Sequence, residues 1–131
     1  FNTRKDIKIN LIKPENDIYF HFDTLQISRC FSNLIKNAIE AVEKIPNPAV
    51  EVLMATDAKN IKIEIKDNGV GIDEKMLSKI FEPYFTTKTK GTGLGLSIVK
   101  RIIEDHGGKI KIEKNKNMAG TTSLINFEYN A

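Results

Sequence analysis

Residues 90–100 read KGTGLGLSIVK: Gly91, Gly93 and Gly95 are separated by single residues, and an apolar helical pattern follows them. Glycine allows sharp turns and lets a ligand approach the backbone closely. The first turn of a helix adds free N–H groups and the positive end of the helix dipole. The spacing is neither that of a Walker phosphate loop nor that of a dinucleotide-binding fold. The stretch therefore predicts either a tight turn into a helix or a phosphate-binding loop.

The composition is that of one globular domain. The chain has 131 residues, of which 40% are hydrophobic, and this is enough for a single core. Its 20 basic residues are interleaved with 17 acidic ones, so we expect no nucleic-acid partner. Cys30 is the only cysteine, which excludes an internal disulfide, and no apolar run is long enough to span a membrane. We expect a cytoplasmic domain without direct membrane contact.

Hydrophobic periodicity predicts an alternation of strands and helices. Strands are predicted where apolar residues alternate with polar ones, at 7–11, 18–22, 50–55, 61–65, 110–112 and 120–129. Helices are predicted from the N-cap residue Asp23 to about Ile45, from Asp73 to Ile80, and from Leu94 to His106. A hairpin turn is expected at 57–60 and a solvated loop at 114–117.

The helix predicted at 23–45 has two distinct faces. Its apolar face is expected to pack in the core and comprises Ile27, Phe31, Leu34, Ile35, Ala38, Val42 and Ile45. The opposite face carries Asn33, Lys36 and Asn37, for which solvation is the simplest interpretation. Two asparagines one turn apart, however, work against helix propensity. Amide oxygens can coordinate Mg²⁺ and Lys36 could contact a phosphate, so this face is a candidate metal and phosphate site.

A second candidate site follows the strand predicted at 61–65. Asp67 stands at the end of this strand, and Gly69 and Gly71 come after it. A carboxylate in this position could accept a hydrogen bond from an amino group such as that of adenine. The alternative is a plain turn, for which the sequence Asp-Asn-Gly is typical. The pattern leaves both interpretations open.

Aromatic residues and then basic ones precede the glycine-rich stretch. Residues 81–90 read FEPYFTTKTK. An aromatic hinge followed by a basic tail is what a lid over a polyphosphate would need, although Phe81 and Phe85 could also pack in the core. The two histidines indicate no catalytic role, because His21 is expected at the surface and His106 suits the negative end of a helix.

The order of these motifs resembles that of the sensor histidine kinases. Residues 33–38 resemble their N box, 67–71 their first glycine box, 81–85 their F box and 91–96 their second glycine box. Gly120 and Thr121 match a late Gly-Thr pair of the family. The whole chain, 1–131, is thus identified as a member of the catalytic and ATP-binding domains, most similar to the nitrogen-regulation type. The resemblance implies an α+β Bergerat (GHKL) fold, a two-layer sandwich of a mixed sheet with helices on one face and an ATP lid.

The resemblance also implies a role for each matching residue. Asn37 would coordinate Mg²⁺, and Asn33, Lys36 and Lys88 would form the catalytic set near the phosphates. Asp67 would receive the adenine amino group. Thr121 would support the adenine end, and glycines would let the base lie close. The ATP-binding residues would be Asn33, Asn37, Asp67, Gly69, Gly71, Ile72, Phe85, Lys88, Gly91, Thr92, Gly93, Leu94, Gly95, Leu96 and Thr121.

Three departures from the family pattern matter. Ala41 stands where many sensor kinases have an aromatic residue that stacks on adenine, and Ser123 replaces a bulkier apolar residue. Neither His21 nor His106 has the context of a phosphoacceptor histidine. Because the chain also begins at Phe1, we expect a fragment of a longer kinase, for which a membrane anchor is left open. Its implied partners are a dimerisation and phosphoacceptor domain of the same kinase and the receiver domain of a response regulator.

The residue one turn before the metal-binding asparagine separates two reaction classes. The related gyrase, chaperone and mismatch-repair ATPases carry a glutamate there, whereas this chain has Asn33, which cannot act as a general base. The resemblance therefore implies transfer of the γ-phosphoryl group of ATP to a histidine, for relay to a response regulator. The alternatives are an ATPase or serine-directed kinase of the same fold, or a nucleotide-binding module without turnover.

Overall fold

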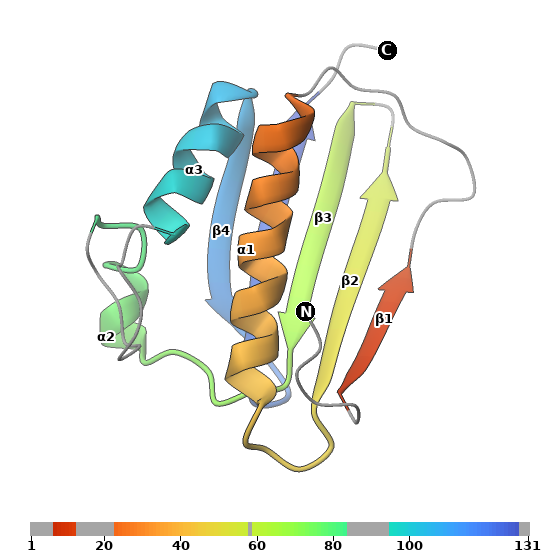
Figure 1. Cartoon of the computed structure of the whole chain (residues 1–131), viewed down its shortest axis with the longest axis vertical. Helices are drawn as coiled ribbons and strands as arrows, with labels where there is room; N and C mark the ends of the chain where they lie inside the picture. The colour runs from red at the N-terminus through yellow and green to blue at the C-terminus, as the bar shows by residue number, and fades with distance from the viewer. Residues whose placement is uncertain (1–6, 13–22, 58, 84–94, 129–131) are drawn as a thin grey trace.

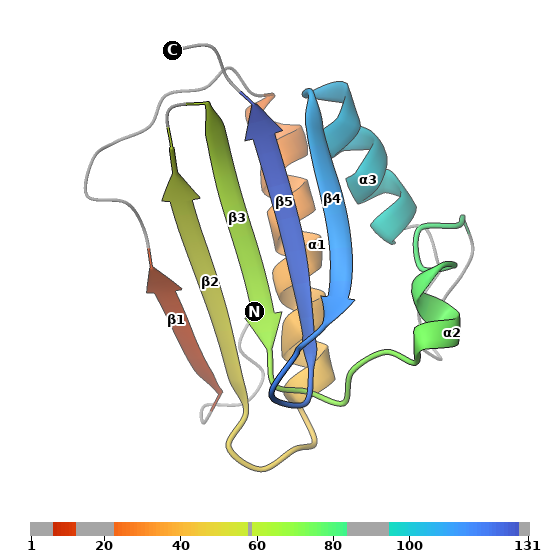
Figure 2. The same cartoon turned by 180° about the vertical axis from the view of Figure 1, so that it is seen from behind.

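The computed structural model describes residues 7–12, 23–57, 59–83 and 95–128. The strand predicted at 18–22 and the part of the predicted lid and glycine loop at 84–94 lie outside these ranges. The described elements are β1 (Lys8–Ile12), α1 (Thr24–Val42), β2 (Ala49–Thr56), β3 (Asn60–Asp67), α2 (Glu74–Leu77), α3 (Gly95–Asp105), β4 (Gly108–Lys114) and β5 (Thr121–Glu128). Figures 1 and 2 show one sheet with α1 and α3 on the same face of it.

The strands of the described residues form a five-stranded mixed sheet in the order β1-β2-β3-β5-β4. β1 runs parallel to β2, and the other neighbouring strands are antiparallel. The turn between β2 and β3 follows from local chemistry, because the Asp57 carboxylate accepts the backbone N–H groups of Lys59 at 2.9 Å and Asn60 at 2.8 Å. The predicted α+β class, mixed sheet and one-sided helices are confirmed.

Helix α1 begins where its sequence predicts and ends earlier. The Asp23 carboxylate accepts the backbone N–H of Gln26 at 3.1 Å, which is the expected N-cap bond. The last helical residue is Val42 rather than one near Ile45. Pro46 disfavours helical backbone at the residue before it, and Asn47 has a φ of 52°, so the chain leaves the helix through a turn.

The two other helices are also close to their predicted positions. Asp73 caps α2 by accepting the backbone N–H of Lys75 at 3.0 Å. Helix α2 ends at Leu77, before the predicted end at Ile80, and turns continue the chain. Helix α3 ends at Asp105, in agreement with the pair of glycines that follows His106.

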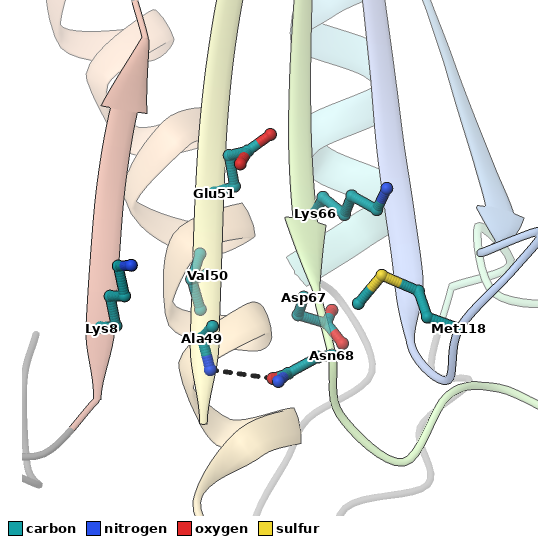
Figure 3. A pocket seen from close by; sticks show the side chains of 8 residues that line it. All are labelled: Lys8, Ala49, Val50, Glu51, Lys66, Asp67, Asn68 and Met118. Atoms are coloured by element: carbon teal, nitrogen blue, oxygen red, sulfur yellow. Dashed lines mark hydrogen bonds between the residues drawn. The ribbon is translucent and has the colours of Figure 1, made fainter. Parts of the chain in front are cut away.

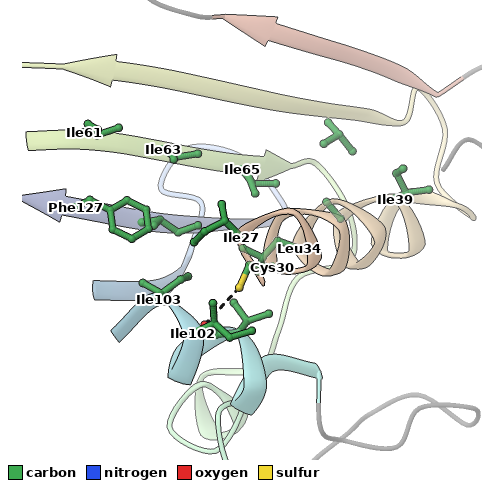
Figure 4. Close-up of a cluster of buried hydrophobic side chains, with 14 of the residues drawn as sticks. Ile27, Cys30, Leu34, Ile39, Ile61, Ile63, Ile65, Ile102, Ile103 and Phe127 are labelled. Atoms are coloured by element: carbon green, nitrogen blue, oxygen red, sulfur yellow. Dashed lines mark hydrogen bonds between the residues drawn. The ribbon is translucent and has the colours of Figure 1, made fainter. Parts of the chain in front are cut away.

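The core lies between the sheet and the two longer helices. Figure 4 shows Ile27, Cys30 and Leu34 of α1 against isoleucines of β3 and α3 and against Phe127. The predicted core positions Ile27, Leu34, Ala38 and Val42 are buried, whereas Phe31, Ile35 and Ile45 are half-buried. Cys30 and Ile39 are buried although they were not predicted to be. Helix α1 buries more than one stripe because it packs against α3 as well as against the sheet.

His106 joins the beginning of α1 to the end of α3. Its Nδ1 lies 2.7 Å from the carbonyl oxygen of Ile102, and its Nε2 accepts the backbone N–H of Asp23 at 3.0 Å. The ring is therefore assigned as the tautomer with a proton on Nδ1. The structural helix-end role expected for His106 is confirmed, and the link to α1 is an addition that the sequence did not reveal.

The sheet face opposite α1 and α3 is called the open face below. Glu51, Glu64 and Lys66 project from it, because side chains alternate between the two faces along each strand. None of the helices in the described ranges is long and apolar enough to cross a membrane.

Candidate functional site

Helix α1 presents a row of residues that leads to the loop after β3. Asn33, Asn37 and Ala41 are spaced one turn apart, so they lie above one another on one side of the helix. Asn33 and Asn37 are half-buried, and Lys36 beside them is exposed. At the end of the row, the carbonyl oxygen of Ala41 accepts the backbone N–H of Val70 at 3.3 Å. The helix that carries the predicted metal-binding face thus contacts the predicted adenine-binding loop one turn beyond Asn37.

Asp67 is a buried carboxylate at the end of β3. Only 6% of the residue is exposed, and it faces the α1 side of the sheet because its register partner is the core residue Val50. Its Oδ1 accepts the backbone N–H of Gly69 at 2.9 Å, and the backbone N–H of Thr121 also donates to the carboxylate. Burial raises the pKa of this carboxyl group, and the two N–H donors oppose that rise in part.

The bonds to Gly69 and Thr121 do not saturate Asp67. A carboxylate offers about four acceptor positions on its two oxygens, so it can accept a further donor from a ligand. Thr121 is itself buried, with 8% of its surface exposed, and lies on the same side of the sheet as Asp67. The two predicted adenine-end residues are therefore adjacent, and their environment excludes water from the hydrogen bond that a ligand would make.

Glycine is needed at positions 69 and 71 for two different reasons. A Cβ at Gly69 would lie 2.3 Å from the carbonyl oxygen of Ala41, so close contact with α1 already demands glycine there. At Gly71 the φ of 78° is the constraint, and a Cβ would meet nothing closer than the backbone of Gly120 at 3.8 Å. Gly69 thus serves packing of the chain on itself, and its predicted contact with a base stays a prediction. Ile72, which follows, is half-buried.

Two contacts fix how α3 lies along α1. The bond between Asp23 and His106 joins one pair of helix ends, and Cys30 Sγ lies 3.8 Å from the carbonyl oxygen of Val99. Cys30 lies seven residues after Asp23, and Val99 lies seven residues before His106, so the two contacts fit one antiparallel register. Figure 1 shows that the two helices run in opposite directions. Extending this register brings the first turn of α3 alongside the level of Asn33 on α1.

The first turn of α3 brings anion-binding chemistry to the same region. Gly95 is exposed, and a Cβ there would meet no atom within 4 Å. Leu96 is half-buried against the core. The backbone N–H groups and the dipole at the start of a helix favour a negatively charged group, here near the amides of α1.

Of the predicted lid, only residues 81–83 are among the described residues. Phe81 is half-buried, and Lys100 Nζ of α3 lies 5.3 Å from the centre of its ring, a cation–π contact. Phe85, Lys88, Gly91, Thr92, Gly93 and Leu94 lie outside the described residues, and their roles stay predictions.

A cavity of about 220 Å³ lies elsewhere, on the open face of the sheet. Figure 3 shows Lys8, Glu51 and Lys66 around it, with α1 behind the strands. Asp67 contributes to its wall, but none of the α1 amides does. Since it brings together none of the other predicted site residues, we place the candidate site on the α1 side of the sheet.

Sequence reasoning missed Asn115. The segment 114–117 was predicted to be a solvated loop, and this is wrong for Asn115, which is half-buried and hydrogen-bonded through its side chain to Asp67 and Ala119. The only signal was its place five residues before Gly120, and no local pattern distinguishes it from the other polar residues of that loop.

Comparisons with known proteins show the family and the fold of this chain. Residues 22–130 match a family described as histidine kinase-, DNA gyrase B-, and HSP90-like ATPase. Sporulation kinase A of Bacillus subtilis (strain 168) is 40% identical over 113 residues, which are 86% of this chain and 18% of that protein. A putative sensor histidine kinase NtrY-like of Rickettsia bellii (strain RML369-C) is 41% identical over 108 residues, 82% of this chain and 18% of that protein.

Solved structures give the same result. The catalytic domain of histidine kinase ThkA has a TM-score of 0.83 and 34% sequence identity, with 95% of this chain and 80% of that chain covered. ThkA in complex with response regulator protein TrrA gives a TM-score of 0.76 at 31% identity, covering 93% of this chain and 34% of that chain. This chain spans less than a fifth of the length of the two curated relatives.

Proposed function

Because this chain belongs to the histidine kinase-, DNA gyrase B-, and HSP90-like ATPase family, in its sensor histidine kinase branch, we propose that it binds Mg-ATP and donates the γ-phosphoryl group to a histidine on another domain. The observation that carries the proposal is the position of Asp67, a buried carboxylate at the end of the α1 row. Adenine-end and phosphate-end chemistry therefore occur on one side of one sheet.

Asp67 would recognise the base. Its carboxylate keeps free acceptor positions, and the exocyclic amino group of adenine is a donor that a guanine or hypoxanthine base lacks at that position. Low water access makes this hydrogen bond stronger and makes an unmatched base costly. The backbone N–H of Thr121 donates to the same carboxylate and supports it.

The α1 amides and the α3 helix end would hold the phosphate end. The side-chain oxygens of Asn37 and Asn33 are hard neutral donors, which suit Mg²⁺ when phosphate oxygens and waters complete its coordination. Bound Mg²⁺ supplies charge neutralisation on the transferring phosphoryl group. The N–H groups at the start of α3 would bind the phosphate oxygens. Lys36, the neighbour of Asn37 on α1, would add a positive charge beside them.

Asn33 also bears on whether water or a histidine nitrogen attacks the γ-phosphoryl group. A neutral amide cannot take the proton of an attacking water, so the chain orients ATP without activating water. The attacking atom would be a histidine nitrogen, which forms the new P–N bond while the bond to the β-phosphate breaks and ADP leaves. Catalysis would then consist of positioning and charge stabilisation by this domain.

The partners follow from the same chemistry. The histidine would lie on a dimerisation and phosphoacceptor domain of the same kinase, and the phosphoryl group would pass to an aspartate of a response regulator receiver domain. The solved complex of ThkA with TrrA, a response regulator protein, supports this kind of partner. We propose a cytoplasmic location for the domain, and this location holds with or without a membrane anchor in the parent protein.

Calorimetric titration with ATP, with and without Mg²⁺, tests the proposal when a phosphate-release assay is run on the same sample. We expect binding that Mg²⁺ strengthens, with little sustained release of phosphate. Sustained hydrolysis would instead support an ATPase, and an absence of binding in both titrations would reject the assignment.

A further inference from the structure

Asn115 ties three chain segments together at the adenine end of the site. Its side-chain Nδ2 donates to the backbone carbonyl of Asp67 at 2.7 Å and to that of Ala119 at 3.1 Å. Its Oδ1 accepts the hydroxyl of Thr122 at 2.5 Å. Both N–H bonds of the amide are therefore used, together with an acceptor position.

The Asn115 side chain bridges two strands that are not neighbours in the sheet. β5 lies between β3 and β4, so the Asn115 side chain reaches from the end of β4 past the start of β5 to the end of β3. The bridge needs the glycine beside it, because a Cβ at Gly120 would lie 2.0 Å from the Asp67 carbonyl oxygen and 2.9 Å from Asn115 Nδ2. The last register pair of β3 and β5 is Lys66 with Thr122. The amide of Asn115 thus bonds a carbonyl that lies just beyond the last paired residues of β3 and β5.

The same contacts act on the carboxylate of Asp67 in two ways. Asn115 holds the residue's backbone directly through its carbonyl. It also closes the turn on Ala119 and Thr122, and its backbone N–H donates to the carbonyl of Gly120 at 3.1 Å. That closed turn carries Thr121, whose backbone N–H donates to the Asp67 carboxylate.

We infer that Asn115 is a positioning residue for Asp67 that sets adenine selectivity of the nucleotide site. It fixes the direction in which the buried carboxylate offers its remaining acceptor positions to the base, and it contacts no ligand itself. A hydrogen bond to a base depends steeply on direction, so a small rotation of the carboxylate weakens it. This inference rests on the proposed function, because it assumes that the ligand of Asp67 is the adenine amino group.

The test compares Asn115→Asp with two matched controls. Asn115→Asp keeps the size of the side chain and the acceptor for Thr122, but it replaces the donor by an oxygen that faces carbonyls. Thr122→Val removes only the hydroxyl contact and leaves both donations of Asn115 intact. Asn117→Asp makes the same charge change at an exposed position of the same turn.

Each variant is titrated with ATP and with inosine triphosphate, in which an oxygen replaces the 6-amino group of the base. We expect Asn115→Asp to weaken ATP binding about tenfold while inosine triphosphate binding changes little, because only the base contact is misdirected. Both controls should keep the wild-type ratio of the two affinities. An unchanged ratio in Asn115→Asp, or an equal loss for both nucleotides, would overturn the inference.

Further measurements keep the outcome interpretable. If Asn115→Asp does not fold, Asn115→Ser replaces it. The serine hydroxyl retains one donor, so we expect a ratio of ATP to inosine triphosphate affinity between those of wild type and a full loss of the donor. A wild-type ratio in Asn115→Ser would also overturn the inference. Asp67→Asn separates the two hypotheses. If it abolishes the preference for ATP but Asn115→Asp does not, only the role of Asn115 is rejected. If wild type and Asp67→Asn show no preference, the proposed function of Asp67 fails first.

Discussion

The buried carboxylate of Asp67 costs electrostatic free energy when it is charged. Burial raises the pKa of its carboxyl group above the ordinary value of 3.8, with partial opposition from the N–H groups of Gly69 and Thr121. The folded state therefore binds the proton more tightly than the unfolded state. As pH rises from 3.8 to the raised pKa, the unfolded state loses its proton first, and the free energy of unfolding falls. Above that window the full cost of the buried charge persists, and the proposed binding of a ligand by Asp67 would explain why a carboxylate occupies this position.

Asp67→Asn should separate stability from binding. The amide keeps the shape and an acceptor oxygen but removes the buried charge, so we expect the urea midpoint at neutral pH to equal or exceed that of wild type. The difference should shrink as pH is lowered toward 3.8. ATP affinity should fall by about tenfold, roughly 1.4 kcal/mol. Glu64→Gln, on the open face of the same strand, is the control, and a clear loss of stability in Asp67→Asn would show that the carboxylate stabilises the fold.

Single residues differ in how far sequence could predict them. Asp67 and the two asparagines of α1 could be singled out from the sequence because their signals are local, namely a strand end and a one-turn spacing, and their roles stay predictions. Asn115 was not, since its Asp67 partner is 48 positions away and its pairing exists only in the folded sheet. Gly69 lies in the loop after β3, where the sequence placed it, but the structural reason for a glycine is the close contact with Ala41. That contact depends on how α1 packs against the loop.

At the scale of elements, α1 organises the molecule. Its beginning is joined to the end of α3 by His106, its middle contacts α3 through Cys30, and its end contacts the loop after β3 through Ala41. These contacts hold the α1 amides, the start of α3 and the Asp67 loop in fixed relation. The boundaries of the elements could be predicted within a few residues, but the contacts between them could not, because they join segments far apart in sequence.

Gly69→Ala tests the contact between α1 and the Asp67 loop. The added Cβ would lie 2.3 Å from the Ala41 carbonyl oxygen, so the loop must move away from the helix. We expect a loss of about 2 kcal/mol in the free energy of unfolding, measured with urea. Gly95→Ala is the control, since a Cβ there meets no atom within 4 Å and alanine favours a helix. Equal stability of the two variants would contradict the close contact.

His106→Ala tests the joint between the helix ends. The variant leaves the Asp23 N–H and the Ile102 carbonyl without their ring partner, so we expect a loss of about 1–2 kcal/mol in the free energy of unfolding. Lys109→Ala, a nearby exposed position, should change it little. Amide exchange at the two helix ends gives a second measurement, and faster exchange should be confined to those ends. Unchanged stability and exchange would show that the joint is dispensable.

At the scale of the whole molecule, the sheet separates two surfaces. The α1 side carries the amides, Asp67 and the start of α3, while the open face holds the cavity around Glu51 and Lys66. The family resemblance predicted the mixed sheet and the one-sided helices, but periodicity could not give the order β1-β2-β3-β5-β4, which depends on long-range pairing. The proposed function requires that the nucleotide occupies the α1 side of the sheet alone.

Nuclear magnetic resonance titration of the labelled chain with Mg²⁺ and a non-hydrolysable ATP analogue tests this requirement most directly. We predict that the largest amide shifts fall at Asn33, Asn37, Asp67, Thr121 and the first turn of α3. Glu51 and Glu64 on the open face should shift little, as internal controls. Shifts concentrated around Glu51 and Lys8, or an absence of shifts at saturating analogue, would contradict the proposed nucleotide site.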